Sequence, residues 1–404
     1  MKSRCTILFL AVLVQLVSGS LYASEKPAIH IDFYGHEINF SPDQSFLRTL
    51  PAEANKEEIV NFVKQLYQSD YQTCSSALIQ YKKTVQPDDW LFYQLVRKTA
   101  QEISPKSENY IRYTLYKYFL MAKSGYNVML SISEGKLLFY VQSDENIYNI
   151  PYRTKNNKNY ICLNFHDYKD IDIDKEKFIE IANEEHEINK GFSYKITRLP
   201  EFPKDSYIEK EIRFNYYQSD YHFKVKINPQ VKTIFNNYPV VDYADYLNIP
   251  LSTITYQSLI PILKKELKGM SVKDGVDYLM RFTRYSFSFE SDTKNFGKEK
   301  RLSPEQTLLY EKSDCDDRVA LCYFLVKEIY NLPMIVVSYP QHVTLAIALD
   351  KPVGKPLIYN GVKYSICEPT PQKDDLPMGR TLPELRSVQY EVVYAYQPSS
   401  PIRR

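Results

Sequence analysis

The sequence is poor in glycine and tryptophan: its 404 residues include 11 Gly and a single Trp. With so little glycine, we find no glycine-rich loop that could cradle a phosphate. The 51 basic and 49 acidic side chains nearly cancel, so charge gives no simple argument for nucleic acid or an acidic partner. A composition of 44% hydrophobic and 25% charged residues excludes wholesale disorder. The function must therefore depend on a local site.

Cysteine is also scarce, since six residues are too few for a disulfide scaffold in a chain of this length. No paired Cys or His spacing indicates zinc. The segment around His186, residues 183–187, lacks the second His of a metalloprotease motif. Its charged residues are typical of a solvent-exposed face. We therefore expect no metal and no other cofactor.

The first 23 residues have the pattern of a secretory signal peptide. Lys2 and Arg4 precede an apolar run at residues 6–17, and small residues lead to Ala23. The alternative is an uncleaved N-terminal anchor, although the run is too short to span a membrane stably. We expect an exported protein, periplasmic or secreted, with no stable membrane span after cleavage. Five cysteines would remain, and an odd number suggests at least one free thiol in a monomer.

The order of periodic segments predicts an α+β fold in three parts after the signal peptide. Residues 24–165 combine helical patterns, such as 57–68 and 90–103 with Asp88 as N-cap, with strand-like runs at 127–132 and 136–142. Residues 166–250 look mainly β, because 212–216 and 221–227 alternate around a polar turn. Helical patterns return in residues 251–404. Capping boxes predict helix starts after Ser271 and Ser303.

Cys315 lies where a strongly periodic helix begins. Apolar side chains recur at helical spacing after it, at Val319, Cys322, Val326 and Ile329. A helix N-terminus favours a thiolate, and its free N–H groups can bind an oxyanion. The neighbouring acids Asp314, Asp316 and Asp317 oppose ionisation of the thiol if they point inward. The sequence leaves open which effect is larger.

Two later residues could complete a nucleophilic site. His342, the one histidine after Cys315, begins an apolar strand, and Glu368 ends another. The separations are 27 and 26 residues. An imidazole can accept the thiol proton, and a carboxylate can orient the imidazole and stabilise its charged form. Cys322 and Cys367 are expected to be small buried side chains.

At these residues the sequence resembles the transglutaminase-like superfamily, whose domains have a papain-like fold. The resemblance covers residues 255–395 and is carried by Ser-Asp-Cys-Asp-Asp-Arg at 313–318, Gln-His-Val at 341–343 and Tyr-Ser-Ile-Cys-Glu-Pro-Thr at 364–370. The family pattern has Gly more often than Ser before the Asp-Cys pair, and Asp-Pro-Thr where this chain has Glu368-Pro369-Thr370. The second departure lengthens the orienting side chain by one methylene.

The resemblance implies that Cys315 is the nucleophile, His342 the general base and acid, and Glu368 the orienting carboxylate. The oxyanion would be held by the Cys315 N–H and one upstream side chain, with Gln306 and Tyr310 as candidates. The implied function is an exported cysteine hydrolase that cleaves peptide or isopeptide amides of peptides, proteins or cell-wall peptides. The alternatives are a non-catalytic scaffold or binding protein with a papain-like shell and a transamidating transglutaminase. The oligomeric state is not predicted.

The first half repeats the element order of the candidate catalytic domain. Aligning Arg112 with Arg318 places Asn109 on Cys315 and Lys136 on His342, and a two-residue gap places Asn164 on Glu368. We hypothesise that residues 24–165 are a degenerate transglutaminase-like copy without the triad. An unrelated α+β domain is the alternative, and a different strand order in the two halves would exclude the duplication.

Overall fold

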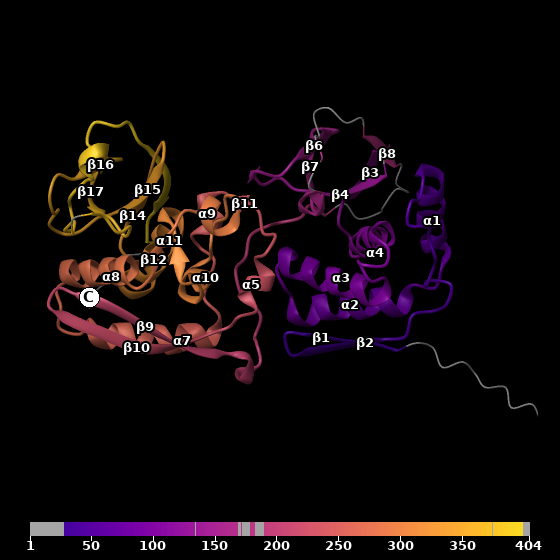
Figure 1. The fold of residues 1–404 in the computed structure, drawn as a ribbon, viewed down its shortest axis with the longest axis horizontal. Coiled ribbons are helices and arrows are strands. Elements are labelled where there is room, and N and C mark those ends of the chain that lie inside the picture. Colours follow the sequence, from indigo (N-terminus) through magenta and orange to yellow (C-terminus); the bar gives the residue numbers. More distant parts are fainter. Residues whose placement is uncertain are drawn as a thin grey trace, which may run out of the picture.

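The structure, a computed structural model, has the α+β fold that the sequence predicts, with helices and strands mixed along the chain. It describes residues 28–133, 135–168, 171, 178–181, 190–373 and 375–398. The predicted signal peptide and the segment around His186 lie outside these ranges. Figure 1 shows two lobes, each with a sheet and several helices. Within the described ranges, no helix is both long and apolar enough to cross a bilayer.

The N-terminal lobe is built from a hairpin, four helices and a five-stranded sheet. Its elements are β1 (Ile29–Phe33), β2 (His36–Phe40), α1 (Lys56–Gln68), α2 (Gln72–Val85), α3 (Asp89–Ile103), α4 (Tyr110–Lys123), β3 (Val128–Ser133), β4 (Lys136–Gln142), β5 (Ile147–Tyr148), β6 (Tyr152–Lys155), β7 (Lys158–Cys162), the 3₁₀ turn η1 (Phe165–Asp167) and β8 (Ile179–Ile181).

The C-terminal lobe contains the residues of the candidate site. Its elements are η2 (Lys204–Ser206), β9 (Ile208–Tyr216), β10 (Ser219–Ile227), α5 (Val231–Ile234), β11 (Val240–Val241), α6 (Tyr243–Tyr246), α7 (Thr253–Glu266), α8 (Val272–Tyr285), β12 (Ser288–Phe289), α9 (Asp292–Phe296), α10 (Pro304–Leu309), β13 (Lys312–Ser313), α11 (Cys315–Tyr330), β14 (Met334–Tyr339), β15 (His342–Ile347), β16 (Leu357–Tyr359), β17 (Val362–Cys367), η3 (Pro383–Leu385) and β18 (Glu391–Tyr396).

The two five-stranded sheets have the same strand order. The order is β6-β7-β4-β3-β8 in the N-terminal lobe and β16-β17-β15-β14-β18 in the C-terminal lobe, with every pairing antiparallel. In each lobe a long helix, α4 or α11, directly precedes the first sheet strand. A different strand order in the two lobes would have excluded an internal duplication, and the two orders are the same. The duplication stays a hypothesis.

Each sheet is covered on both faces, so its central strands are mostly apolar and are buried along almost their whole length. In the C-terminal sheet, Val336, Leu345 and Cys367 belong to the main core, which also contains the buried face of α11. Their neighbours along the strands, including Ile335 and Ile366, form a second cluster on the opposite face. A similar second cluster lies on the sheet of the N-terminal lobe. Two-sided burial fixes the strand register, because a one-residue slip would exchange the two faces.

In its described part, the region 166–250, predicted to be mainly β, contains one long hairpin, β9–β10, together with the short strands β8 and β11 and the short helices α5 and α6. The hairpin packs against α7 and α8, so it covers helices of the C-terminal lobe and does not form a layer of its own. Its outward residues explain the alternating pattern of the sequence, since one face contacts helices and the other contacts water.

Candidate functional site

Cys315 is the first residue of α11, as the sequence predicts, and a capping box fixes the helix start there. The Asp314 carboxylate accepts the backbone N–H groups of Asp316 (3.1 Å) and Asp317 (3.4 Å). In return, the Asp317 carboxylate accepts the N–H of Asp314 at 3.2 Å. Cys315 is half-buried and lies at the positive end of the helix dipole.

His342 and Glu368 are brought together by neighbouring strands. β15 begins at His342 and pairs with β17, where Leu345 lies opposite Cys367, so the start of one strand adjoins the end of the other. The His342 Nε2 and Glu368 Oε2 atoms are 2.8 Å apart. The other carboxylate oxygen accepts the N–H of Thr370 at 2.9 Å. Because Nε2 contacts the carboxylate, Nδ1 is the ring nitrogen left to take a proton from a thiol.

The carboxylate favours the charged form of the imidazole. Burial disfavours the imidazolium, but the hydrogen bond and charge of Glu368, with Asp316 and Glu384, raise the pKa of His342 above its ordinary value. Glu368 itself is 3% exposed, so water screens this pair weakly. A raised histidine pKa and a fixed ring orientation are the properties expected of a general base that must hold a proton during a reaction.

The surroundings of the Cys315 thiol favour its protonated form. Burial and the negative charges of Asp316 and Asp314 raise its pKa, while the N–H of Val343, the residue after His342, opposes this rise. The sequence left open whether these acids or the helix start has the larger effect on the thiol pKa. In the structure the acids act in the same direction as burial, so they favour the neutral thiol. In the described ranges no hydrogen bond joins the Cys315 sulfur to the His342 ring. The structure thus places His342 and Glu368 in contact and Cys315 beside the strand that carries His342.

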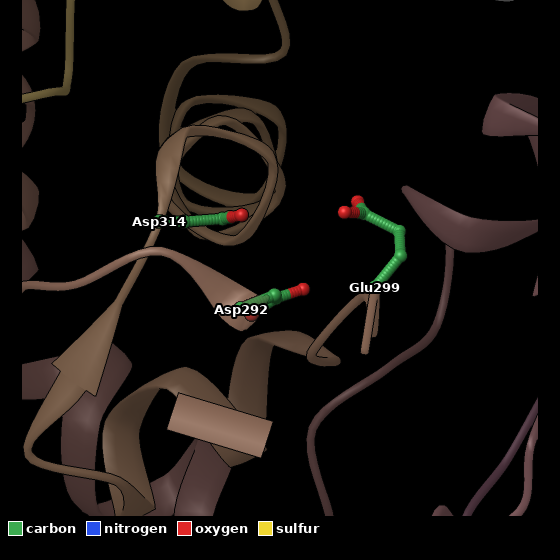
Figure 2. Close-up of side chains that lie close together, drawn as sticks. All are labelled: Asp292, Glu299 and Asp314. Carbon is green, nitrogen blue, oxygen red and sulfur yellow. The ribbon is translucent and has the colours of Figure 1, made fainter. Parts of the chain in front are cut away.

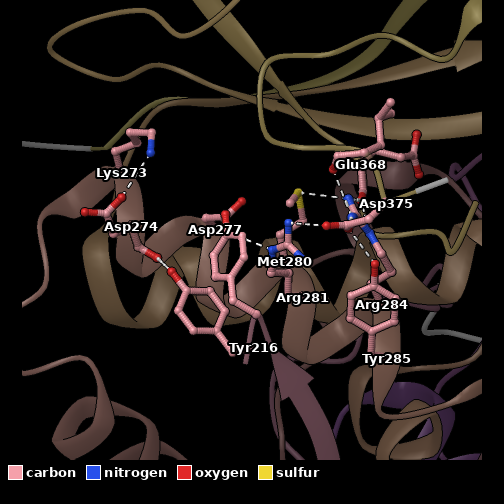
Figure 3. Close-up of polar contacts among 12 residues, drawn as sticks. Tyr216, Lys273, Asp274, Asp277, Met280, Arg281, Arg284, Tyr285, Glu368 and Asp375 are labelled. Carbon is pink, nitrogen blue, oxygen red and sulfur yellow. Dashed lines mark hydrogen bonds and ion pairs between the residues drawn. The ribbon is translucent and has the colours of Figure 1, made fainter. Parts of the chain in front are cut away.

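Two buried arginines position the site, and sequence reasoning missed the role of both. Arg284 of α8 donates from Nε to the Glu368 carbonyl oxygen at 3.1 Å and from Nη1 to the Leu376 carbonyl oxygen at 2.9 Å. Figure 3 shows that Asp375, which contacts Arg284 at 3.0 Å and Arg281 at 2.7 Å, holds this side chain in place. Arg284 is 1% exposed, so its side chain is fixed and its hydrogen bond holds the Glu368 backbone carbonyl in position.

Arg318 plays the corresponding part for Cys315. Its guanidinium is fully buried and donates to the carbonyl oxygens of Thr283, Arg284 and Phe287 at 2.7–3.1 Å. The first turn of α11 is therefore tied to the end of α8, the helix that also fixes Glu368. Burial lowers the pKa of Arg318 to about 10, so the side chain remains charged at neutral pH. For Arg284, the sequence does contain a signal. The helix α8 is mostly buried, and the charged residues Asp277, Arg281 and Arg284 recur on it at intervals of four and three residues.

The two candidate oxyanion side chains lie in or next to α10. The amide oxygen of Gln306 accepts the N–H of Ser303 at 3.0 Å, which closes the predicted capping box. Gln306 is fully buried, and its Nε2 has no hydrogen-bond partner among the described residues. Tyr310 follows α10, with its ring edge-on to Phe296. Neither side chain has a hydrogen bond to Cys315 in the described ranges, and the oxyanion donor stays a prediction.

Three carboxylates gather beside the start of α11, and we call Asp292, Glu299 and Asp314 the acidic cluster (Figure 2). One oxygen from each lies within 4.8 Å of the others. Oxygen donors suit hard cations such as Ca²⁺, yet acidic groups of this kind are common without an ion, so the cluster alone does not define a metal site. Burial and then the charge of Asp314 raise the pKa of Asp292 to about 8.

The acidic cluster should make the protein less stable as the pH rises. A carboxyl with a raised folded-state pKa binds its proton more tightly when folded, so its stabilising effect is complete below its ordinary pKa of 3.8 and is lost as the pH rises through about 8. We expect Asp292→Asn to raise the free energy of unfolding at pH 8 by about 2 kcal/mol, and by less at pH 5. Thermal unfolding in the presence of a chelator measures both values.

The control for this experiment is Asp205→Asn, an exposed aspartate, which should change stability little at either pH. The amide oxygen that Asp292→Asn introduces can still accept the Lys300 N–H, which the native carboxylate accepts at 2.7 Å. An equal loss of stability at both pH values would show that the carboxylate itself is needed and would contradict the predicted repulsion.

The comparisons with known proteins do not identify a family. No family model matches the chain, and no curated protein or solved structure matches it. The site described above therefore has to be interpreted from its own residues: a thiol at a helix start, an adjacent strand with an imidazole, and a carboxylate 2.8 Å from that imidazole.

Proposed function

We propose that the protein is an exported cysteine hydrolase of transglutaminase-like type that cleaves peptide or isopeptide amide bonds. The observation that supports this best is the 2.8 Å contact between His342 Nε2 and Glu368 Oε2, on a strand that adjoins the start of α11. A buried carboxylate that orients an imidazole beside a thiol is the arrangement used for nucleophilic catalysis. A buried carboxylate is unfavourable unless it is paired and hydrogen-bonded, and here His342 and the Thr370 N–H are its partners.

The proposed reaction starts from the neutral thiol. Nδ1 of His342 removes the Cys315 proton while the sulfur attacks the amide carbonyl carbon, and the carbonyl π electrons move to oxygen. The N–H groups at the start of α11 stabilise that oxyanion. Collapse breaks the C–N bond, His342 gives its proton to the departing amine, and an acyl thioester remains. Water, deprotonated by His342, then releases the acid and restores the thiol.

The acceptor decides between hydrolysis and transamidation, because both begin with the same thioester. We favour water as the acceptor and peptides, proteins or cell-wall peptides as substrates. A non-catalytic binding protein is the second candidate, and one observation favours it: burial, with the charges of Asp316 and Asp314, raises the pKa of Cys315. The two candidates differ in whether Cys315 becomes acylated.

Selective alkylation of Cys315 tests the proposal. Among the cysteines of the described ranges, Cys315 is half-buried and Cys74, Cys162, Cys322 and Cys367 are fully buried. We expect iodoacetamide to modify Cys315 at least about 10-fold faster than Cys322 or Cys367, because access and a nearby base both favour it. Mass spectrometry of the digested protein measures the rates.

The alkylated protein also serves as the activity control. Labelled peptides and cell-wall fragments are incubated with untreated and alkylated protein, and products are identified by mass spectrometry. Cleavage by the untreated protein alone supports the hydrolase, and an amide formed with added amine would instead identify a transamidase. Equal alkylation of all cysteines, or cleavage that survives alkylation, would count against Cys315 as the nucleophile.

A further inference from the structure

Helix α3 carries a polar stripe that does not face the core. Gln94, Arg97, Lys98 and Gln101 recur at positions i, i+3, i+4 and i+7, while the positions between them are mostly apolar and buried. This stripe lines a cavity of about 1000 Å³. The opposite walls are the β1–β2 turn, the loop around Phe202, and α5. The cavity is therefore distinct from the Cys315 site and draws on both lobes.

The cavity wall has more positive than negative charge. Arg97, Lys98, Lys106 and Lys232 line it, against Asp32 and Asp205. The Asp32 carboxylate accepts the N–H of Gly35 in its own turn at 2.7 Å. Asp205 is exposed, and Lys106 pairs with Asp167 at 2.6 Å. Within the described ranges Arg97 forms no ion pair, although the charge of Asp167 acts on it from farther away.

Gln94 supplies an unused donor beside this arginine. Arg97 Nη1 donates to the Gln94 amide oxygen at 2.9 Å, which fixes the orientation of the amide. The Gln94 Nε2 group is left without a partner in the described part of the chain, although the residue is only 8% exposed. A buried donor without an acceptor is unfavourable, so a small shift of this side chain toward a ligand oxygen in the cavity, which Gln94 lines, would be favourable.

A further basic side chain, Lys117, packs against Tyr113, one of the residues that line the cavity. Lys117 is 1% exposed, its ammonium lies 4.4 Å from the centre of the Tyr113 ring, and no ion pair is formed by it in the described ranges. Burial and then the charge of Arg97 lower the pKa of Lys117 to about 7. Burial, with the charges of Arg97, Lys117 and Lys106, also lowers the pKa of His166 to about 4. Burial is the larger cause of both pKa shifts, and the charge of Arg97 adds to it, so the positive field of Arg97 extends to these neighbouring groups.

We propose that this cavity binds a small anionic ligand through a carboxylate that Arg97 and Gln94 hold. Arg97 offers a planar pair of donors that matches a carboxylate, and the free Gln94 Nε2 adds a third. Phe33, Tyr34 and Phe202 line the same cavity, with the Tyr34 and Phe202 rings 5.2 Å apart, and give the ligand carbon skeleton an apolar surface. An acidic sugar and an acidic peptide share this chemistry.

The fluorescence of the single tryptophan can be used to detect ligand binding. Trp90 donates from Nε1 to the carbonyl oxygen of Ile234 at 2.8 Å, and Ile234 belongs to α5, which forms one wall of the cavity. The full chain is titrated with trigalacturonate, with a glutamate-containing tripeptide, and with the matching glutamine tripeptide as the neutral control. Calorimetry measures binding directly, and Trp90 fluorescence reports changes at α5.

We expect saturable binding of at least one acidic probe and at least 10-fold weaker binding of the neutral tripeptide if the peptide is the ligand. Arg97→Gln should weaken acidic-probe binding roughly 10- to 100-fold. Arg213→Gln, an exposed arginine of β9, should leave it unchanged. If Arg97→Gln does not fold, Lys232→Gln at the exposed edge should weaken binding several-fold. Absence of saturable binding to either acid, equal binding of acid and amide, or binding unaffected by these variants would overturn the proposal.

Discussion

Replacement of Cys315 by alanine should abolish amide cleavage, with a loss of at least about 10⁴-fold in kcat. The sulfur is the atom that forms the thioester, and no other cysteine in the described ranges is accessible enough to replace it. Alanine removes the sulfur without adding a charge, and α11 keeps its capping box because Asp314 and Asp317 form it. Rates are measured on the peptide or cell-wall fragment that the wild-type protein cleaves.

Cys322→Ala is the matched control, since Cys322 lies on the same helix and is fully buried. It should lose some stability from the small cavity but keep its rate at temperatures below its unfolding transition. Circular dichroism of both variants separates misfolding from loss of chemistry. A folded Cys315→Ala protein with wild-type cleavage would reject Cys315 as the nucleophile. Absence of cleavage by the wild-type protein itself would favour the binding-protein candidate.

Local features of the site were readable from the sequence. The helices predicted after Ser271 and Ser303 and the helix start at Cys315 are all found, and Ser303 forms its capping box with Gln306. At Ser271 only half of the predicted box forms: its hydroxyl accepts the Asp274 N–H, and the Asp274 carboxylate accepts the Ser271 hydroxyl. Each helix start depends on a side chain that bonds a backbone group three residues away, so the information lies within a few neighbouring residues. The contact of His342 with Glu368 follows from the pairing of β15 with β17. Only the short strand β16 lies between these two strands in the sequence.

Contacts between residues that lie far apart in the sequence could not be predicted from it. Asp88 is the N-cap residue of α3, as predicted, but its side chain makes no capping bond to the helix. Its carboxylate accepts the N–H groups of Thr197 and Arg198 instead, at 2.7 and 3.2 Å. The roles of Arg284 and Arg318 depend on carbonyl oxygens about 30 to 90 residues away in the chain. A propensity for helix says nothing about such partners, because the fold alone brings them together.

Glu368→Gln should lower kcat/KM by about 10²- to 10⁴-fold and move its acid limb to lower pH. Glutamine keeps the length of the side chain but removes the negative charge that raises the pKa of His342. Because His342 must be neutral to accept the thiol proton, the wild-type acid limb should lie above the ordinary histidine pKa of 6.5. With the charge removed, burial dominates, and the histidine pKa should fall below that of the wild type.

Glu368→Asp separates charge from geometry. It keeps the carboxylate and is the residue found more often at this position in the transglutaminase-like pattern, but it shortens the side chain by one methylene. We expect it to keep the raised pKa of His342 in part and to lose less activity than Glu368→Gln. The histidine pKa is measured by NMR of the imidazole ring and the rate by the same cleavage assay. An unchanged histidine pKa in Glu368→Gln would contradict the electrostatic role. A lowered pKa with full activity would mean that Glu368 tunes His342 without contributing to catalysis.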